Sequence, residues 1–251
     1  MAGHSKFKNI MYRKSAQDKK RASLFAKLTR EIIVAVKTGG HDPDSNNRLR
    51  LAIATARSNS MPKNNIERAI KRGDGSSNDD NYMDIRYEGY GPYGTAVIVE
   101  CLSDNRNRTA ADIRTIFAKA NGSMGESNSV AFLFERLGRI EFSKNSCDEE
   151  SIFEAALEAG AENIETHEEM HEILCADSKL HQVSSFLEQR FGDPQSVQLI
   201  WKPKQEPTMI TDEEQAIALL KMVDSLEEHD DVQNVFVNFD IEESLMMRLR
   251  F

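Results

Sequence analysis

The stretch Arg139-Ile140-Glu141-Phe142-Ser143 alternates polar and apolar side chains, as a β-strand does when only one of its faces is buried. The pattern continues outward over residues 138–202 as strand, helix, strand, strand, helix and strand, which we place at 139–143, 149–159, 163–167, 172–176, 178–191 and 196–201. The order βαββαβ is that of a ferredoxin-like α+β domain. The sequence therefore predicts such a domain over residues 138–203.

The segments on either side of this domain each hold part of a second set of elements. Before it, two strand-like runs and a helical pattern occupy residues 83–88, 95–102 and 109–120. After Pro203 and Pro207, residues 211–228 predict a helix and 232–240 a strand. A helix and a strand alone cannot cover a sheet, so we expect them to complete a second βαββαβ set with residues 82–136. The ferredoxin-like domain is then inserted into a discontinuous α+β domain formed by residues 81–137 and 204–251.

The beginning of the chain has a helical period. Apolar residues recur every three or four positions at Leu24, Phe25, Leu28, Ile32 and Val36, which predicts a helix over residues 16–37. A second helix is expected over 45–58, and a third follows Met61-Pro62 and stops at Gly73. Residues 73–80, which have no apolar side chain, are typical of a linker. The predicted fold class is multidomain α+β: a three-helix domain over residues 1–72, followed by two ferredoxin-like domains, the third inserted into the second.

Charge divides the chain into two unlike parts. Residues 1–72 hold 17 Lys and Arg against 5 Asp and Glu, a net charge of +12, whereas the remainder carries −21. A local block of positive charge is the usual footprint of a phosphate backbone, because each neutralised phosphate releases a condensed counterion. The acidic remainder would be repelled by a polyanion. The charge pattern therefore predicts a nucleic-acid partner for the first 72 residues.

Several classes of protein are disfavoured by composition. The longest aliphatic run, Ile32 to Val36, has five residues, far short of the ~20 that span a bilayer. Basic residues near the start are followed by no apolar core, so we expect no signal peptide and no membrane partner. Three widely spaced cysteines without a CxxC pair are typical of reduced thiols, which favours a cytoplasmic protein.

Many short stretches resemble the YebC/PmpR family. They are Ala2-Gly3-His4-Ser5-Lys6-Phe7-Lys8-Asn9-Ile10, Gln17-Asp18-Lys19-Lys20-Arg21, Lys27-Leu28-Thr29-Arg30-Glu31-Ile32, Asn47-Arg48-Leu49-Arg50-Leu51-Ala52-Ile53, Met61-Pro62-Lys63, Asn65-Ile66-Glu67-Arg68-Ala69-Ile70, Tyr87-Glu88-Gly89-Tyr90-Gly91-Pro92 and Asp104-Asn105-Arg106-Asn107-Arg108-Thr109. The resemblance implies three domains, one helical and two α+β, and a nucleic-acid-linked regulator. Members are described both as DNA-binding transcriptional regulators and as translation factors acting at the ribosome. Phe7 and Tyr12 depart from the family pattern, which usually has Trp and His there.

The N-terminal arm is the first candidate binding site. Basic residues and two interleaved aromatic residues follow one another at Lys6, Phe7, Lys8, Tyr12, Arg13, Lys14, Lys19, Lys20 and Arg21. Cations neutralise phosphates, and an aromatic ring stacks on an unpaired base, which contributes about 1–3 kcal/mol per base. The alternative is a solvated tail without a ligand.

A second group of cations follows on the second and third predicted helices, and only Glu67 interrupts it. Its members are Arg48, Arg50, Arg57, Lys63, Arg68, Lys71 and Arg72. A phosphate-facing surface is favoured over an ordinary solvated helix face, which typically mixes charge signs. The third helix offers no decisive set of base-reading residues, so sequence-specific readout is only weakly indicated.

Three further residues are possible cleft or partner contacts. Tyr90 lies in the glycine-rich Tyr87–Gly94 connection, where an aromatic ring could pack on the sheet or face a ligand. Arg106 and Arg108 lie where a strand gives way to a helix, and either a phosphate or partner contact or an interdomain salt bridge to the acidic surface explains them. Thr109 and Asp112 have the spacing of a capping box, which would start that helix.

The pentad His167-Glu168-Glu169-Met170-His171 matches the HExxH zinc-protease pattern, which works only on a helix. Strand-like alternation on both sides predicts a hairpin turn instead, so we expect no metal, no cofactor and no catalytic residues. The sequence favours a non-enzymatic DNA-binding transcriptional regulator. The alternative is a translation factor that binds ribosomal RNA or the ribosome, and a metal-dependent hydrolase is a distant third.

Overall fold

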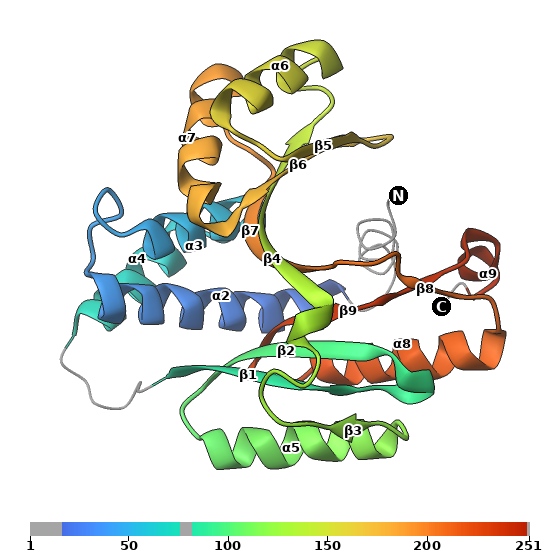
Figure 1. Ribbon diagram of the computed structural model, residues 1–251. Coiled ribbons are helices and arrows are strands. Elements are labelled where there is room, and N and C mark those ends of the chain that lie inside the picture. The colour runs from blue at the N-terminus through green and yellow to red at the C-terminus, as the bar shows by residue number, and fades with distance from the viewer. Residues whose placement is uncertain (1–16, 76–81, 250–251) are drawn as a thin grey trace. The chain divides into compact units, whose positions relative to one another are not determined.

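The computed structural model describes residues 17–75 and 82–249, with side chains from residue 21 onward, and it shows a multidomain α+β protein with a helical N-terminal region (Figure 1). The described residues form two compact units. One unit comprises residues 17–30, 82–135 and 202–249, and the other comprises 31–75 and 136–201. The domain boundaries expected from the sequence remain a prediction.

The sheet of the first unit draws strands from both sides of residues 136–201. Its order is β3-β1-β2-β9, with bounds β1 Met83–Tyr90, β2 Ala96–Ser103, β3 Ser123–Met124 and β9 Val232–Val237. All three pairings are antiparallel. Helices α5 (Arg106–Lys119) and α8 (Glu213–Glu227) pack on it through Phe117 and Leu219, which join one core with the strand residues Val99 and Val235. The four strands and two helices of the expected set are present, but their order along the chain differs from βαββαβ. The first two strands form a hairpin, so the order is ββαβ before the insertion and αβ after it.

The end of the chain is more divided than the sequence indicates. The strand expected over 232–240 is split at Asn238 into β9 and β10 (Phe239–Ile241). Asn238 binds Ala96 through both its backbone N–H and its side-chain oxygen, while its carbonyl accepts from Thr208. The chain therefore turns, and β10 pairs in parallel with β8 (Thr208–Ile210), followed by α9 (Glu243–Arg248).

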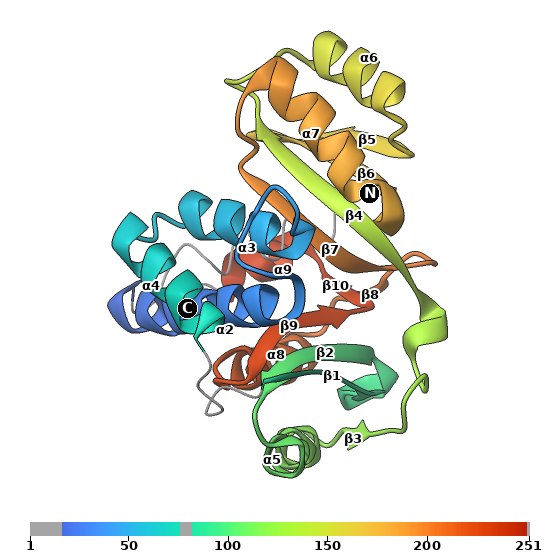
Figure 2. The same cartoon turned by 90° about the vertical axis from the view of Figure 1, so that its left-hand side faces the viewer.

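The sheet of the second unit has the spatial order β5-β6-β4-β7, which is the ferredoxin-like arrangement. Its strands are β4 (Phe134–Ser143), β5 (Asn163–Thr166), β6 (Met170–Ala176) and β7 (Ser196–Pro203). Figure 2 shows α6 (Glu149–Ala159) and α7 (Leu180–Phe191) side by side on one face. Ile140, Phe142 and Ile173 lie in the core beneath these helices. The alternation at residues 139–143 thus places one face of β4 against the helices, as predicted.

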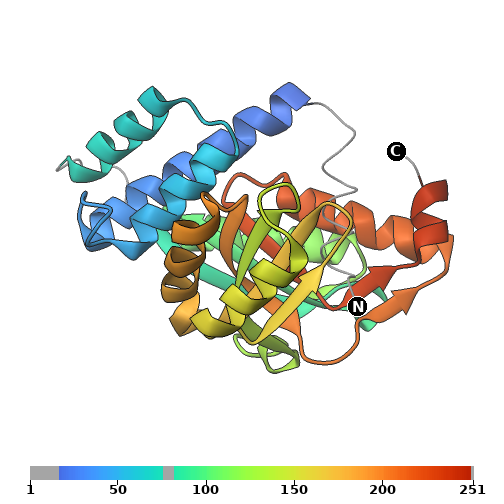
Figure 3. The same ribbon diagram turned by 90° about the horizontal axis from the view of Figure 1, so that it is seen from above.

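Within residues 17–75 the structure describes three helices, as expected: α2 (Gln17–Gly39), α3 (Asn47–Ser58) and α4 (Lys63–Asp74), coloured blue to teal in Figure 3. Asn46 joins the first two. Its buried side chain accepts from the N–H of Leu49 as the cap of α3, and its amide donates to the carbonyls of Ala35 and Gly40 at 2.7 Å each. One side chain thus fixes the end of α2 and the start of α3.

The capping box expected at Thr109 and Asp112 is wrong. Helix α5 begins three residues earlier, at Arg106, where the side chain of Asn105 accepts from the N–H of Arg108 at 3.1 Å. The hydroxyl of Thr109 is buried and is used elsewhere, in a 2.7 Å hydrogen bond to Asp231. Among the described helices, none is long and apolar enough to cross a membrane.

Candidate nucleic-acid interface

Helix α4 presents a basic face to solvent. Ile66 and Ala69 lie on its buried side, and residues three or four apart share a helix face. Asn64, Arg68 and Lys71 follow that spacing and are all exposed, on the side opposite to the buried one. Among the described residues, neither Arg68 nor Lys71 has an ion-pair partner. Two cations on one exposed face are therefore available to phosphate.

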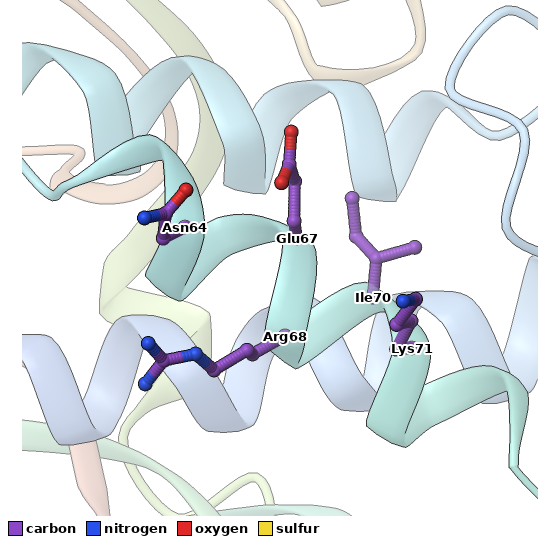
Figure 4. A pocket seen from close by; sticks show the side chains of 5 residues that line it. All are labelled: Asn64, Glu67, Arg68, Ile70 and Lys71. Atoms are coloured by element: carbon purple, nitrogen blue, oxygen red, sulfur yellow. The ribbon is translucent and has the colours of Figure 1, made fainter.

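The same face lines a pocket of about 450 Å³. Figure 4 shows its lining side chains, all from α4: Asn64, Glu67, Arg68, Ile70 and Lys71. Ile70 and the carbon stems of the charged side chains supply most of the exposed lining, so the pocket by itself does not select a charged ligand.

Other predicted cations of this region differ in how far they are neutralised. Arg48 forms two hydrogen bonds with the carboxylate of Glu31, at 2.7 Å and 3.0 Å, so its charge is already balanced. Arg50 donates to Asn47 and lies 3.1 Å from a ring nitrogen of His181. Lys63 is exposed and lies 3.8 Å from Glu67, a surface pair that costs little to break. Arg72 and Arg57 are exposed.

The N-terminal arm lies largely outside the described residues. This applies to Lys6, Phe7, Lys8, Tyr12, Arg13 and Lys14. Lys19 and Lys20 lie in the first turns of α2, and Arg21 is exposed, with its guanidinium 5.4 Å from the centre of the Phe25 ring.

Two cations of α2 that the charge count treats as basic surface are engaged within the first unit. Lys27 donates to the carbonyl of Glu227 at 2.6 Å, at the last residue of α8, where the helix dipole favours a cation. Burial lowers the pKa of Lys27, although Glu227 and Asp230 oppose the shift. Arg30 donates to the carbonyl of Asp230 and lies 3.3 Å from the carboxylate of Asp231. These groups are structural rather than available for binding.

Asp231 accepts several hydrogen bonds from distant parts of the chain, which could not be predicted from the sequence. It is 3% exposed and accepts from Thr109 at 2.7 Å, from Arg108 at 2.9 Å and from Ser103 at 3.1 Å. Burial alone would raise its pKa, but these hydrogen bonds and the charge of Arg108 hold the pKa below its usual range. A lone Asp in an acidic segment shows nothing of this, because its partners are more than 120 residues away.

Arg108 forms ion pairs, whereas Arg106 is exposed. Arg108 pairs with Asp104 at 2.8 Å as well as with Asp231, and both carboxylates belong to its own unit, so these pairs are not the interdomain salt bridge considered from the sequence. A partner contact at Arg108 stays a prediction. Arg106 is exposed, and its backbone carbonyl accepts from the hydroxyl of Tyr87 at 3.1 Å.

The glycine-rich stretch Tyr87–Gly94 was expected to link two strands, but its residues 87–90 belong to β1. Its aromatic residues divide between the core and the surface. Tyr87 is buried, whereas Tyr90 is 37% and Tyr93 58% exposed. The hydroxyl of Tyr90 donates to the carbonyl of Ser129 at 3.4 Å. Tyr93 adopts a positive φ of 61°, which is unusual for a non-glycine residue. Tyr90 is therefore accessible for contact, and its role in binding stays a prediction.

The HExxH pentad is a hairpin turn, as predicted. The N–H of His167 donates to the carbonyl of Met170 at 2.8 Å between β5 and β6. His171 lies on β6, with Nε2 3.2 Å from the carbonyl of Cys147 and Nδ1 3.0 Å from the hydroxyl of Thr166. Since a carbonyl only accepts, Nε2 donates to it, while Nδ1 is hydrogen-bonded to the hydroxyl of Thr166. Both nitrogens are used, so the two histidines do not form a protease-type metal site.

The cysteines are free thiols, as expected, and two of them are poor nucleophiles. Burial raises the pKa of the Cys101 thiol to about 12 and that of Cys175 to about 11. Both thiols therefore stay protonated at neutral pH. Because only the thiolate form of cysteine is a nucleophile, both are unreactive there.

Similarity to known proteins extends over nearly the whole chain. Residues 5–76 match the TACO1/YebC protein N-terminal domain, and residues 82–239 match the TACO1/YebC second and third domain. A probable transcriptional regulatory protein of Zymomonas mobilis is 52% identical over 250 residues, which cover 99% of each chain. A conserved hypothetical protein from Aquifex aeolicus has a crystal structure that matches with a TM-score of 0.82 at 44% identity, over 92% of this chain and 95% of its own. The chain belongs to the TACO1/YebC family.

Proposed function

We propose that this chain is a non-enzymatic, cytoplasmic regulator that binds DNA and controls transcription. Its Zymomonas mobilis relative is named a probable transcriptional regulatory protein, which supports the transcriptional part of the proposal. The observation that carries the proposal is the exposed α4 face, where Arg68 and Lys71 have no carboxylate partner among the described residues. Arginine and lysine in such a setting neutralise phosphates without competition from the protein's own acids. Arg68 and Lys71 thus form the centre of the binding surface.

The proposed binding residues fall into two groups. One group belongs to the N-terminal arm and the start of α2: Lys6, Phe7, Lys8, Tyr12, Arg13, Lys14, Lys19, Lys20 and Arg21. The other group belongs to α4: Lys63, Arg68, Lys71 and Arg72. Arg48 and Arg50 contribute less, since Glu31 balances the first and Asn47 and His181 bind the second. In this proposal residues 1–72 act as the binding domain, 73–80 as a linker, and the two α+β domains, 81–137 with 204–251 and 138–203, as the regulatory part.

A translation factor that binds the ribosome is the second candidate, and the surface of α6 favours it. Its exposed residues include Glu149, Glu150, Glu154 and Glu158 together with the apolar Phe153 and Leu157, 49% and 54% exposed. Such a face repels duplex DNA but suits the basic proteins that surround ribosomal RNA. Ribosomal RNA also offers unpaired bases on which Phe7 and Tyr12 could stack.

The experiment that separates the two measures binding to duplex DNA by fluorescence anisotropy and binding to ribosomes by co-sedimentation, each at two salt concentrations. Transcriptional control predicts duplex binding that weakens steeply with salt and no co-sedimentation at the higher salt. Co-sedimentation that persists at the higher salt, with weaker duplex binding, would replace the first function by the second. Absence of both would contradict the nucleic-acid proposal.

A further inference from the structure

Helix α6 presents two large apolar side chains to solvent. Phe153 is 49% and Leu157 is 54% exposed, and residues four apart on a helix lie next to one another on one face. The opposite side of α6 is buried in the core of the second unit and holds Ile152, Ala155, Ala156 and Ala159. Phe153 and Leu157 therefore form an apolar strip on the solvent side of the helix, outside the core.

A row of carboxylates follows this strip along the same side of α6. Glu150, Glu154 and Glu158 are all exposed and are spaced four residues apart, so each lies beside the next. Like charges at this spacing destabilise a helix. The helix contains no lysine or arginine, so it does not neutralise the row itself.

The second unit neutralises one end of the row. Arg190 of α7 forms an ion pair of 2.8 Å with Glu158, which lies in the last turn of α6, where the helix dipole disfavours a carboxylate. Glu150 and Glu154 have no ion-pair partner in the part of the chain whose side chains the structure describes. The carboxylates beside the apolar strip are thus available to cations from another molecule.

We propose that the solvent side of α6 binds a basic amphipathic helix of a partner protein. This surface, the α6 face, comprises Glu150, Phe153, Glu154 and Leu157. Apolar side chains of the partner helix pack against Phe153 and Leu157, and lysine or arginine side chains beside them pair with the glutamates. Helices of coiled coils recognise one another in this way, through an apolar seam with opposite charges along its edges. The apolar contact supplies affinity, and the charges select the partner.

The charge of the α6 face disfavours three other occupants. Duplex DNA and RNA carry phosphates, which the carboxylates repel. A membrane surface of anionic lipids is repelled for the same reason. A second copy of this chain would bring its own carboxylates against the first set. The inference goes beyond the proposed function, because it applies to a regulator of transcription and to a translation factor and does not require nucleic-acid binding.

The test is the binding of a synthetic peptide to the full chain, measured by fluorescence anisotropy at low and at high salt. The peptide is a helix with leucine at every third or fourth position and lysine between. We expect Phe153→Ser/Leu157→Ser to weaken binding at least about tenfold, because truncating the apolar anchors of an interface removes much of its affinity. Glu150→Gln/Glu154→Gln should weaken binding several-fold at low salt and less at high salt, since salt screens exposed charges.

Two matched control variants change the same kinds of group in the first unit. Phe132→Ser/Met209→Ser removes two exposed apolar side chains, and Glu213→Gln/Glu214→Gln removes two exposed carboxylates of α8. Both should bind the peptide like the parent chain, and a peptide with glutamate in place of lysine should not bind. Circular dichroism checks the fold of every variant. Binding of the α6 variants to duplex DNA should be unchanged, which separates a failure of this proposal from a failure of the nucleic-acid proposal.

The proposal is overturned if the lysine peptide does not bind, if the glutamate peptide binds as tightly, or if the α6 variants and their controls lose equal affinity. Tighter peptide binding by Lys6→Gln/Lys8→Gln than by the parent chain would replace the partner with the chain's own N-terminal arm. A dimer in analytical ultracentrifugation that Phe153→Ser/Leu157→Ser dissociates would replace the partner with a second copy.

Discussion

Arg108 and Asp231, which are 123 residues apart in the chain, form an ion pair of 2.9 Å. The arginine is 49% exposed, so the pair by itself contributes little. The carboxylate, however, is nearly fully buried and also accepts from the hydroxyls of Thr109 and Ser103. The network therefore connects the start of α5 to the residue that precedes β9. These two parts of the first unit are more than 120 residues apart in the sequence.

Asp231→Ala should lower the free energy of unfolding by roughly 3 kcal/mol, because buried donors lose their acceptor and Arg108 loses its partner. Urea denaturation of the variant and the parent chain measures this change in the free energy of unfolding. The matched control is Asp230→Ala: that side chain is exposed, so the change should stay within about 0.5 kcal/mol. If both substitutions lowered the free energy of unfolding equally, the hydrogen bonds of Asp231 would not contribute more to stability than an exposed carboxylate does.

Acid should weaken the protein in part through the same carboxylate. Its pKa in the folded state lies below the value in the unfolded chain, so the unfolded state binds more protons and stability rises with pH. The contribution is complete above the unfolded pKa of about 3.9 and is lost as the pH falls through the folded pKa. Asp231→Asn should therefore make the unfolding free energy less dependent on pH below about pH 4. The hydrogen-bonded Glu88, whose pKa is also lowered, remains in both chains, so their difference isolates Asp231. Parallel curves would refute this assignment.

Elements with strong local signals were predictable from the sequence. The apolar period at Leu28 and Ile32 and the alternation at residues 139–143 gave α2 and β4, and both are present. The start of α5 was not predictable in the same way, because Thr109 has the spacing of a cap but its hydroxyl binds Asp231 instead. The strands β8 and β10, three residues each, are too short to show a period.

For the candidate interface, too, local spacing was predictable from the sequence, but contacts between distant residues were not. The exposed cations Arg68 and Lys71 could be found because helical spacing places them opposite Ile66. That Arg48 is neutralised could not, because its partner Glu31 lies on another helix 17 residues away. A charge count treats Arg48 and Arg68 alike, and only their surroundings separate them.

Phe7→Ala should distinguish stacking from a purely electrostatic arm. We expect a loss of about 1–3 kcal/mol on single-stranded or ribosomal RNA, because an unpaired base offers a face to the ring. Duplex DNA should show little loss unless the ring wedges between base pairs. Affinities for both ligands are compared at one salt concentration, with Phe132→Ala as the control for an exposed ring elsewhere. A negligible loss of affinity for both ligands would show that Phe7 does not stack on a base.

The claim that the α4 face binds nucleic acid is tested most directly by an Arg68→Ala/Lys71→Ala variant. The measurement is the salt dependence of its affinity for nucleic acid. The slope of log K against log salt should become shallower by about 1.4–1.8, at 0.7–0.9 per lost phosphate contact. The matched control is Arg114→Ala/Lys119→Ala, which removes the same charge from exposed positions of α5 and should leave the slope unchanged. An unchanged slope in the α4 variant, or an equal change in both variants, would contradict the proposal that the α4 face binds nucleic acid.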